Sequence, residues 1–238
     1  MIIWIVATVA AYFVKGLCGF ASTMVFTSVL SFSTDNIDIS PIDLLLSYFT
    51  NAAIAWRERK YILWKVCLPL AGLMLAGSIP GLFFLKNTDA SVVKIGFGAV
   101  IIFLGFDMLL KEFRPRKTRD SKVFITVVGI ISGVMYGMYG IGALLSAYIT
   151  RKTDSALAFK ANICTLFLIA DTCRVALYAA TGIITLASIQ RTLLLVPFMA
   201  LGVFLGMKSS SVLNDKTAKR IVIIMLIVSG VALILNNL

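Results

Sequence analysis

Long apolar stretches separated by short polar ones dominate this sequence. The apolar runs are Ile2–Phe32, Pro41–Trp56, Tyr61–Leu85, Val92–Leu110, Val123–Thr150, Ala156–Thr181, Thr192–Met207 and Ile221–Leu235. A run of this length forms either one helix across a hydrocarbon core of about 30 Å or a hairpin that enters it. The pattern therefore predicts an all-α integral membrane protein.

Glycine-rich segments interrupt the first and the fifth run. Lys15–Gly19 divides the first run, and Tyr136–Gly142 divides the fifth. The remaining pieces have about 13 residues or fewer, which is too short to cross a bilayer as a helix. We expect each of these runs to form a re-entrant or broken helical hairpin, with new helices starting near Phe20 and Ile141.

The order of features repeats along the chain. At an offset of 125 residues Gly77 falls on Gly202 and Gly81 on Gly206, and at an offset of 121 Gly16 falls on Gly137. We expect two repeats, each a hairpin followed by three transmembrane helices. They are predicted to span residues 1–110 and 123–238, with a basic cytoplasmic linker at 111–122. The glycine pairs of the third and seventh runs are predicted to serve helix packing.

The distribution of Lys and Arg decides between two topologies. With eight spanning runs, 11 of these residues lie on the cytoplasmic side and 9 outside. With two hairpins and six spans, the numbers are 17 and 3. The positive-inside rule favours the hairpin topology, in which the two repeats are inverted relative to each other. A single kinked span in place of each hairpin is the alternative.

Composition narrows the class of protein. Hydrophobic residues make up 60% of the 238, charged residues only 14%, and the mean hydropathy is +0.98. A soluble domain of this size could not bury so much apolar surface. The net charge of +11 is interpreted as a topology signal and not as nucleic-acid binding. The sequence has no His, and its Cys residues lie apart within apolar runs, so we expect no metal site and no cofactor.

The two breaks point to a polar site near the middle of the bilayer. Irregular backbone at that depth must face protein or water, and a helix that begins there directs free N–H groups at an anion. We therefore predict that a substrate contacts residues at both breaks and polar groups of the second and sixth runs. These are Lys15, Gly16, Gly19, Phe20, Asn51, Tyr139, Gly140, Gly142 and Asn162.

Arg174 is the other cation inside an apolar run. It lies one turn after Asp171, so the two residues either form a structural ion pair or have separate roles. In the second case Arg174 is a substrate-binding anion clamp and Asp171 is a candidate for coupling transport to protons.

At these residues the chain resembles the sulfite exporter TauE/SafE family. The resemblance rests on Gly16-Leu-Cys-Gly19-Phe20-Ala21 and on Gly133-xxx-Gly137-Met-Tyr-Gly140-Ile-Gly142, and the surrounding layout covers essentially the whole chain. Ala21 and Ala143 stand where a further glycine is common. The resemblance implies transport of small sulfur-containing anions such as sulfite or organosulfonates.

The sequence thus predicts a secondary transporter, and not an enzyme, in the inner (cytoplasmic) membrane, which it crosses several times. Its expected partners are a small anionic substrate and the lipid bilayer, with no nucleic acid, and a homodimer is left open. An anion channel or a non-transporting membrane subunit are the alternatives.

Overall fold

The structure, a computed structural model, describes residues 1–30, 36–84, 122–139 and 142–212, with separate positions between 99 and 109 and between 217 and 235. All elements in this part of the chain are helical: α1 (Ile2–Cys18), α2 (Ser22–Leu30), α3 (Asn36–Arg57), the 3-10 turn η1 (Arg59–Tyr61), α4 (Trp64–Phe84), α6 (Lys122–Tyr139), α7 (Ala143–Lys152), α8 (Ala156–Ala180) and α9 (Leu186–Val212). The expected all-α class is therefore confirmed. The fourth and eighth apolar runs, and the linker except Lys122, lie largely outside the described residues.

The chain breaks in the first and fifth runs lie further along than predicted. Lys15 and Gly16 belong to the last turn of α1, which ends only at Cys18. Gly19 then adopts a left-handed conformation with φ 86°, and its N–H donates to the Lys15 carbonyl oxygen over 2.6 Å. The left-handed φ, which glycine adopts without a steric penalty, explains why the helix stops at this residue.

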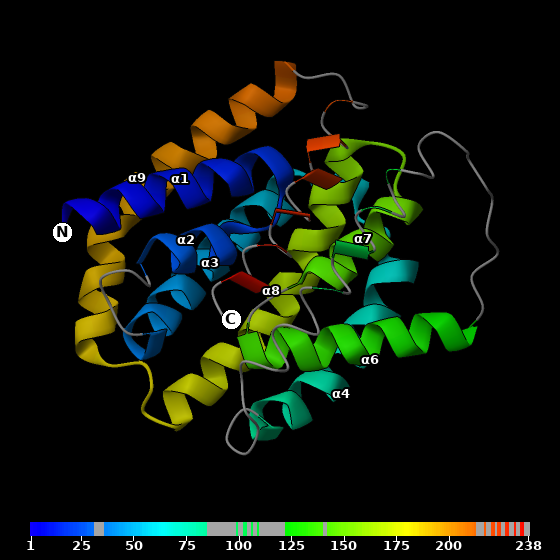
Figure 1. The fold of residues 1–238 in the computed structure, drawn as a ribbon, viewed down its shortest axis with the longest axis horizontal. Coiled ribbons are helices and arrows are strands. Elements are labelled where there is room, and N and C mark those ends of the chain that lie inside the picture. The colour runs from blue at the N-terminus through cyan, green and yellow to red at the C-terminus, as the bar shows by residue number, and fades with distance from the viewer. Residues whose placement is uncertain are drawn as a thin grey trace.

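Two central helices separate two outer pairs (Figure 1). Helices α3 and α8 pack against each other, and α8 crosses the middle of the molecule. Helix α1 lies along α9 on one side, and α4 lies along α6 on the other. The first helix of each half therefore packs against a helix of the other half.

The outer pairs approach closely through glycines in matching register. A Cβ atom added at Gly202 would lie 2.7 Å from the carbonyl oxygen of Val9, and one at Gly77 would lie 2.3 Å from that of Ile130. Gly77 precedes Gly202 by 125 residues, and Ile130 follows Val9 by 121, which are the offsets of the sequence repeat. The predicted packing role is confirmed for these two glycines.

A second pair of close glycine contacts, one in each outer helix pair, is related by the same sequence offsets. A Cβ at Gly16 would lie 2.4 Å from the carbonyl oxygen of Val203, and one at Gly137 would lie 2.4 Å from that of Ser78. These residues are again related by offsets of 121 and 125. The α1–α9 and α4–α6 interfaces are thus built from equivalent positions, and any side chain larger than hydrogen would push the helices apart.

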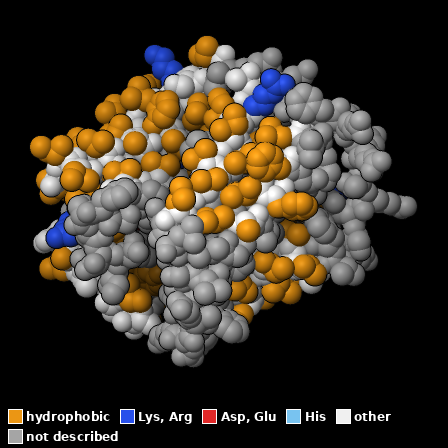
Figure 2. Space-filling model, in the orientation of Figure 1, with side chains coloured by type: hydrophobic (Ala, Val, Ile, Leu, Met, Phe, Trp, Pro, Cys, Tyr) orange, Lys and Arg blue, Asp and Glu red, His pale blue; other side chains and the backbone are white. Residues whose placement is uncertain are grey.

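The surface is apolar in the manner of a protein immersed in lipid. Hydrophobic side chains cover most of the described surface in Figure 2, and Lys and Arg appear near its edges. Among the described residues, Ala156–Ala180 and Leu186–Ser210 are long and apolar enough to cross a membrane. Ile2–Cys18 and Trp64–Ser78 are shorter apolar helices.

Candidate functional site

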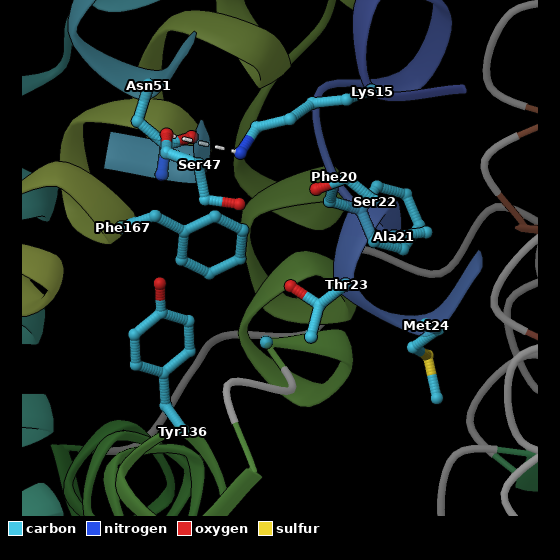
Figure 3. Close-up of a pocket in the computed structure, with 11 residues that line it drawn as sticks. Lys15, Phe20, Ala21, Ser22, Thr23, Met24, Ser47, Asn51, Tyr136 and Phe167 are labelled. Atoms are coloured by element: carbon cyan, nitrogen blue, oxygen red, sulfur yellow. Dashed lines mark hydrogen bonds between the residues drawn. The ribbon is translucent and has the colours of Figure 1, made fainter. Parts of the chain in front are cut away.

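A pocket lies where the two helical hairpins, α1–α2 and α6–α7, meet the central helices (Figure 3). Its free volume is about 20 Å³, which is room for roughly one water molecule. Residues from both hairpins, α3 and α8 line it: Lys15, Phe20, Ala21, Ser22, Thr23, Met24, Ser47, Asn51, Tyr136, Gly142 and Phe167. The structure therefore brings together four residues that the sequence singled out as substrate contacts, namely Lys15, Phe20, Asn51 and Gly142. Gly19 precedes the lining residue Phe20 but does not line the pocket itself.

Lys15 supplies the positive charge of this pocket. Its side chain is only 2% exposed, and its Nζ points toward α3, where it donates to the carbonyl oxygen of Ser47 over 3.4 Å. The ammonium also lies 5.7 Å from the ring centroid of Tyr12. An ammonium has three N–H donors, and within the described residues only Ser47 accepts from this one. Two donors and the charge are therefore available to an anion.

The turn between α1 and α2 forms one wall of the pocket. Gly19 and Ala21 both have positive φ, 86° and 69°, so the chain reverses sharply before α2 begins at Ser22. Phe20 is buried, and its ring packs edge-on against that of Phe159, 6.0 Å away. The first free N–H groups of α2 belong to Ser22, Thr23 and Met24, which all line the pocket. This helix end adds a partial positive charge to that of Lys15.

Tyr136 of α6 and Gly142, which precedes α7, form another wall of the pocket. Tyr136 stacks on Phe167 of α8, with ring centroids 5.0 Å apart and an interplanar angle of 17°. Gly142 caps the N-terminus of α7, and a Cβ there would lie 2.1 Å from the Phe167 ring. A larger residue at this position would have to displace the Phe167 ring from its stack on Tyr136. Because Gly142 also lines the pocket, the N-terminus of α7 begins at the pocket.

Asp171 joins three elements behind the pocket wall. Its Oδ1 accepts from the Tyr136 hydroxyl over 2.6 Å, and its Oδ2 accepts from Nδ2 of Asn51 over 2.8 Å. The side chain is 1% exposed. Both oxygens are thus held by neutral donors, which fix α6 and α3 to α8 at this level.

Arg174 is not paired with Asp171. Its Nη2 donates to the hydroxyl of Tyr178 over 3.2 Å, and the guanidinium carbon lies 5.5 Å and 5.4 Å from the ring centroids of Tyr136 and Tyr178. Its Nε is buried without a hydrogen-bond partner. Arg174 is not among the residues that line the pocket, although its guanidinium lies over the ring of Tyr136, which is.

The other predicted contacts lie elsewhere or fall outside the description. Asn162 donates to the carbonyl oxygens of Tyr61 and Ala158 and accepts from the Leu63 N–H, so its amide joins α8 to the start of α4. Gly16 packs against the backbone of α9. The side chain of Tyr139 and the whole of Gly140 lie outside the described residues.

Two buried charged residues were missed by the sequence reasoning. Asp43 of α3 is 5% exposed, and its Oδ1 lies 3.3 Å from the Tyr12 hydroxyl, which donates to it. Lys160 of α8 is 4% exposed and donates to the Gly16 carbonyl oxygen over 2.8 Å and to the Ser210 hydroxyl. Asp43 lies inside an apolar run, as Arg174 does, and the same criterion would have found it. Lys160 also lies inside an apolar run, Ala156–Thr181, but only four residues after its start, where a cation is expected to mark the membrane edge.

Comparison with known proteins identifies the family. The model of the family described as sulfite exporter TauE/SafE matches residues 3–233. Neither a search of curated proteins nor a search of solved structures gave a match. The match covers nearly all 238 residues, so the chain belongs to the TauE/SafE family, whose members are membrane transporters of sulfite or related anions and not enzymes.

Proposed function

We propose that this protein is a secondary transporter of small sulfur-containing anions, such as sulfite or organosulfonates, and that the anion binds in the pocket between the two hairpin turns. The observation that carries the proposal is Lys15, a buried ammonium that lines the pocket and uses only one of its three N–H donors among the described residues. Burial of an unpaired cation within a membrane is costly, and such a residue is retained where an anion compensates it.

The surroundings of Lys15 strengthen the preference for an anion. The first turn of α2 lines the same pocket, and the first turn of α7 begins at Gly142 on its other side. Free N–H groups at both helix ends provide further donors and partial positive charge. A sulfite or sulfonate group, with three oxygens around one sulfur, can accept from the ammonium and from a helix end together.

The small volume of the pocket supports a carrier over a channel. Room for roughly one water molecule is too little for sulfite, so the pocket has to widen before the anion enters. We infer that the two repeats have inverted topology, which the matching glycine contacts support. Since α1 packs against α9 and α4 against α6, these pairs are the bodies that move relative to each other during alternating access.

The proposal also covers the membrane orientation and the roles of Asp171 and Arg174. The protein would cross the inner membrane several times, with its basic loops in the cytoplasm. Asp171 is the candidate for coupling to protons, because its two hydrogen bonds connect both the pocket residue Tyr136 and the pocket residue Asn51 to α8. Arg174 would attract the anion on the far side of Tyr136.

Thermal stabilisation of the purified protein tests the proposal. Sulfite, thiosulfate, sulfate, taurine, sulfoacetate and matched carboxylates would be titrated against the wild type, Lys15→Ala and Arg174→Ala. A ligand that binds only the folded state raises the melting temperature by mass action. We expect a sulfur-containing anion to stabilise the wild type and to lose this effect in Lys15→Ala. Folded protein that no anion stabilises would contradict the proposal.

A further inference from the structure

The pocket wall contains a hydrogen-bond acceptor that has no donor. The Oδ1 atom of Asn51 is buried and has no partner among the described residues. The other end of the same amide is occupied, because Nδ2 donates to Asp171 over 2.8 Å. This contact fixes the orientation of the amide, since exchanging the two atoms would place a carbonyl oxygen against a carboxylate oxygen.

The other polar groups that line the pocket with Asn51 are mostly donors. Lys15 offers N–H groups only, and the first turn of α2 offers backbone N–H groups together with the hydroxyl of Ser22. Figure 3 shows Lys15, Ser47 and Asn51 on one side of the pocket and Thr23 facing them. An anion whose surface consists of acceptor oxygens satisfies the donors but leaves the Asn51 oxygen unpaired.

We propose that the pocket selects anions that carry a hydrogen-bond donor of their own over anions of equal charge that have none. The negative oxygens face Lys15 and the start of α2, and an O–H or N–H group of the anion donates to Oδ1 of Asn51. Hydrogensulfite and hydroxysulfonates belong to the favoured class, whereas simple alkanesulfonates, which are also monoanions, do not. This inference rests on the proposed function, because it concerns the ligand of the same site.

Selectivity follows from the penalty for an unpaired buried acceptor. The Asn51 oxygen is buried without a donor in this structure, so an anion that donates to it relieves the penalty, whereas an anion without a donor leaves the penalty in place. A penalty of this kind corresponds to about a tenfold loss of affinity or more, and sites built to bond a hydroxyl discriminate strongly against ligands that lack it.

A pair of sulfonates matched in size and charge tests the proposal. 2-Hydroxyethanesulfonate and propane-1-sulfonate have the same number of heavy atoms and one negative charge, and they differ by a hydroxyl in place of a methyl group. Their dissociation constants would be measured by thermal stabilisation of the full chain in detergent. We expect the hydroxysulfonate to bind about tenfold more tightly to the wild type.

The variant Asp171→Asn provides a second, sharper test. The Tyr136 hydroxyl donates to Oδ1 of Asp171 over 2.6 Å, so the introduced amide would keep its oxygen there and turn its NH₂ group toward Asn51. Asn51 then has to rotate its own oxygen to that NH₂ and present its NH₂ to the pocket. We expect the preference for the hydroxysulfonate to disappear in this variant, which differs from the wild type by a single group of equal size.

The outcomes separate the inference from the proposed function. A tenfold preference in the wild type that vanishes in Asp171→Asn supports the inference. Equal affinity for the two sulfonates in the wild type overturns the inference and leaves the anion site intact. Failure of every anion to stabilise the folded wild type overturns both. Because the preference is a ratio measured within one protein, reduced stability of the variant does not affect it.

Discussion

Replacement of Gly206 by alanine tests the close packing of α1 on α9. A Cβ at this position would lie 2.1 Å from the carbonyl oxygen of Phe13, 2.9 Å from the Leu17 nitrogen and 3.0 Å from the Gly16 Cα. These are backbone atoms, so no rotamer change relieves the contact and the two helices have to separate. Overpacking of this kind costs about 1–3 kcal/mol. Alanine also gains about 1 kcal/mol of helix propensity, so we expect Gly206→Ala to lower the free energy of unfolding by up to about 2 kcal/mol.

Gly72 is the matched control, because it is also helical but a Cβ there would meet no atom within 4 Å. Gly72→Ala keeps the propensity gain without the clash and should be stabilising by up to about 1 kcal/mol. Unfolding of both variants by heat or by denaturing detergent in micelles would measure the difference. If Gly206→Ala were as stable as Gly72→Ala, the packing described for α1 and α9 would be refuted. Gly77→Ala, in the other pair, should resemble Gly206→Ala, because a Cβ there would lie 2.3 Å from the carbonyl oxygen of Ile130.

Two further predictions concern the turn after α1 and its neighbours. Ala21 has φ 69°, a conformation that costs a residue with a Cβ about 1–2 kcal/mol. Ala21→Gly should therefore raise the melting temperature, whereas Gly19→Ala, at φ 86°, should lower it. A lower melting temperature for Ala21→Gly than for Gly19→Ala would exclude this turn geometry. Lys160 connects α8 to the carbonyl oxygen of Gly16, and Cys164, which is fully buried, donates to that of Gly19 over 3.4 Å. Lys160→Met should loosen this junction and increase maleimide labelling of Cys164 relative to the wild type, and unchanged labelling would show that Lys160 does not hold it closed.

Helix positions followed closely from the apolar pattern. The run Ala156–Thr181 corresponds to α8 (Ala156–Ala180), and Pro41–Trp56 lies within α3 (Asn36–Arg57). Membrane helices satisfy their own backbone hydrogen bonds, so a long apolar run leaves few alternatives to a helix. The ends were less accurate because polar residues at the rim, such as Asn36, also extend the helix.

The positions of the breaks could not be read from glycine content alone. Gly16 and Gly137 lie within helices because each faces the backbone of a neighbouring helix, which only the tertiary structure reveals. Gly19 ends α1 because its φ is positive. Glycine serves close packing and sharp turns equally well, and its sequence context does not distinguish these roles.

The candidate site was predicted only in part, and the reason is similar. An isolated cation in an apolar run stands out, and Lys15 indeed lines the pocket. Asn162 also stood out, but its amide oxygen and nitrogen already form hydrogen bonds with backbone groups just before α4. A buried polar side chain can bind a ligand only if its spatial neighbours leave some of its donors or acceptors unused. The sequence does not directly show which residues those neighbours are.

The central claim is that Lys15 binds the transported anion, and counterflow of radiolabelled sulfite in proteoliposomes tests it most directly. The wild type would be compared with Lys15→Met and with Lys65→Met, which removes an exposed lysine at the start of α4. We predict saturable counterflow in the wild type and in Lys65→Met, and at least a tenfold loss in Lys15→Met. Undiminished counterflow in Lys15→Met, with the variant shown to be folded, would contradict the claim.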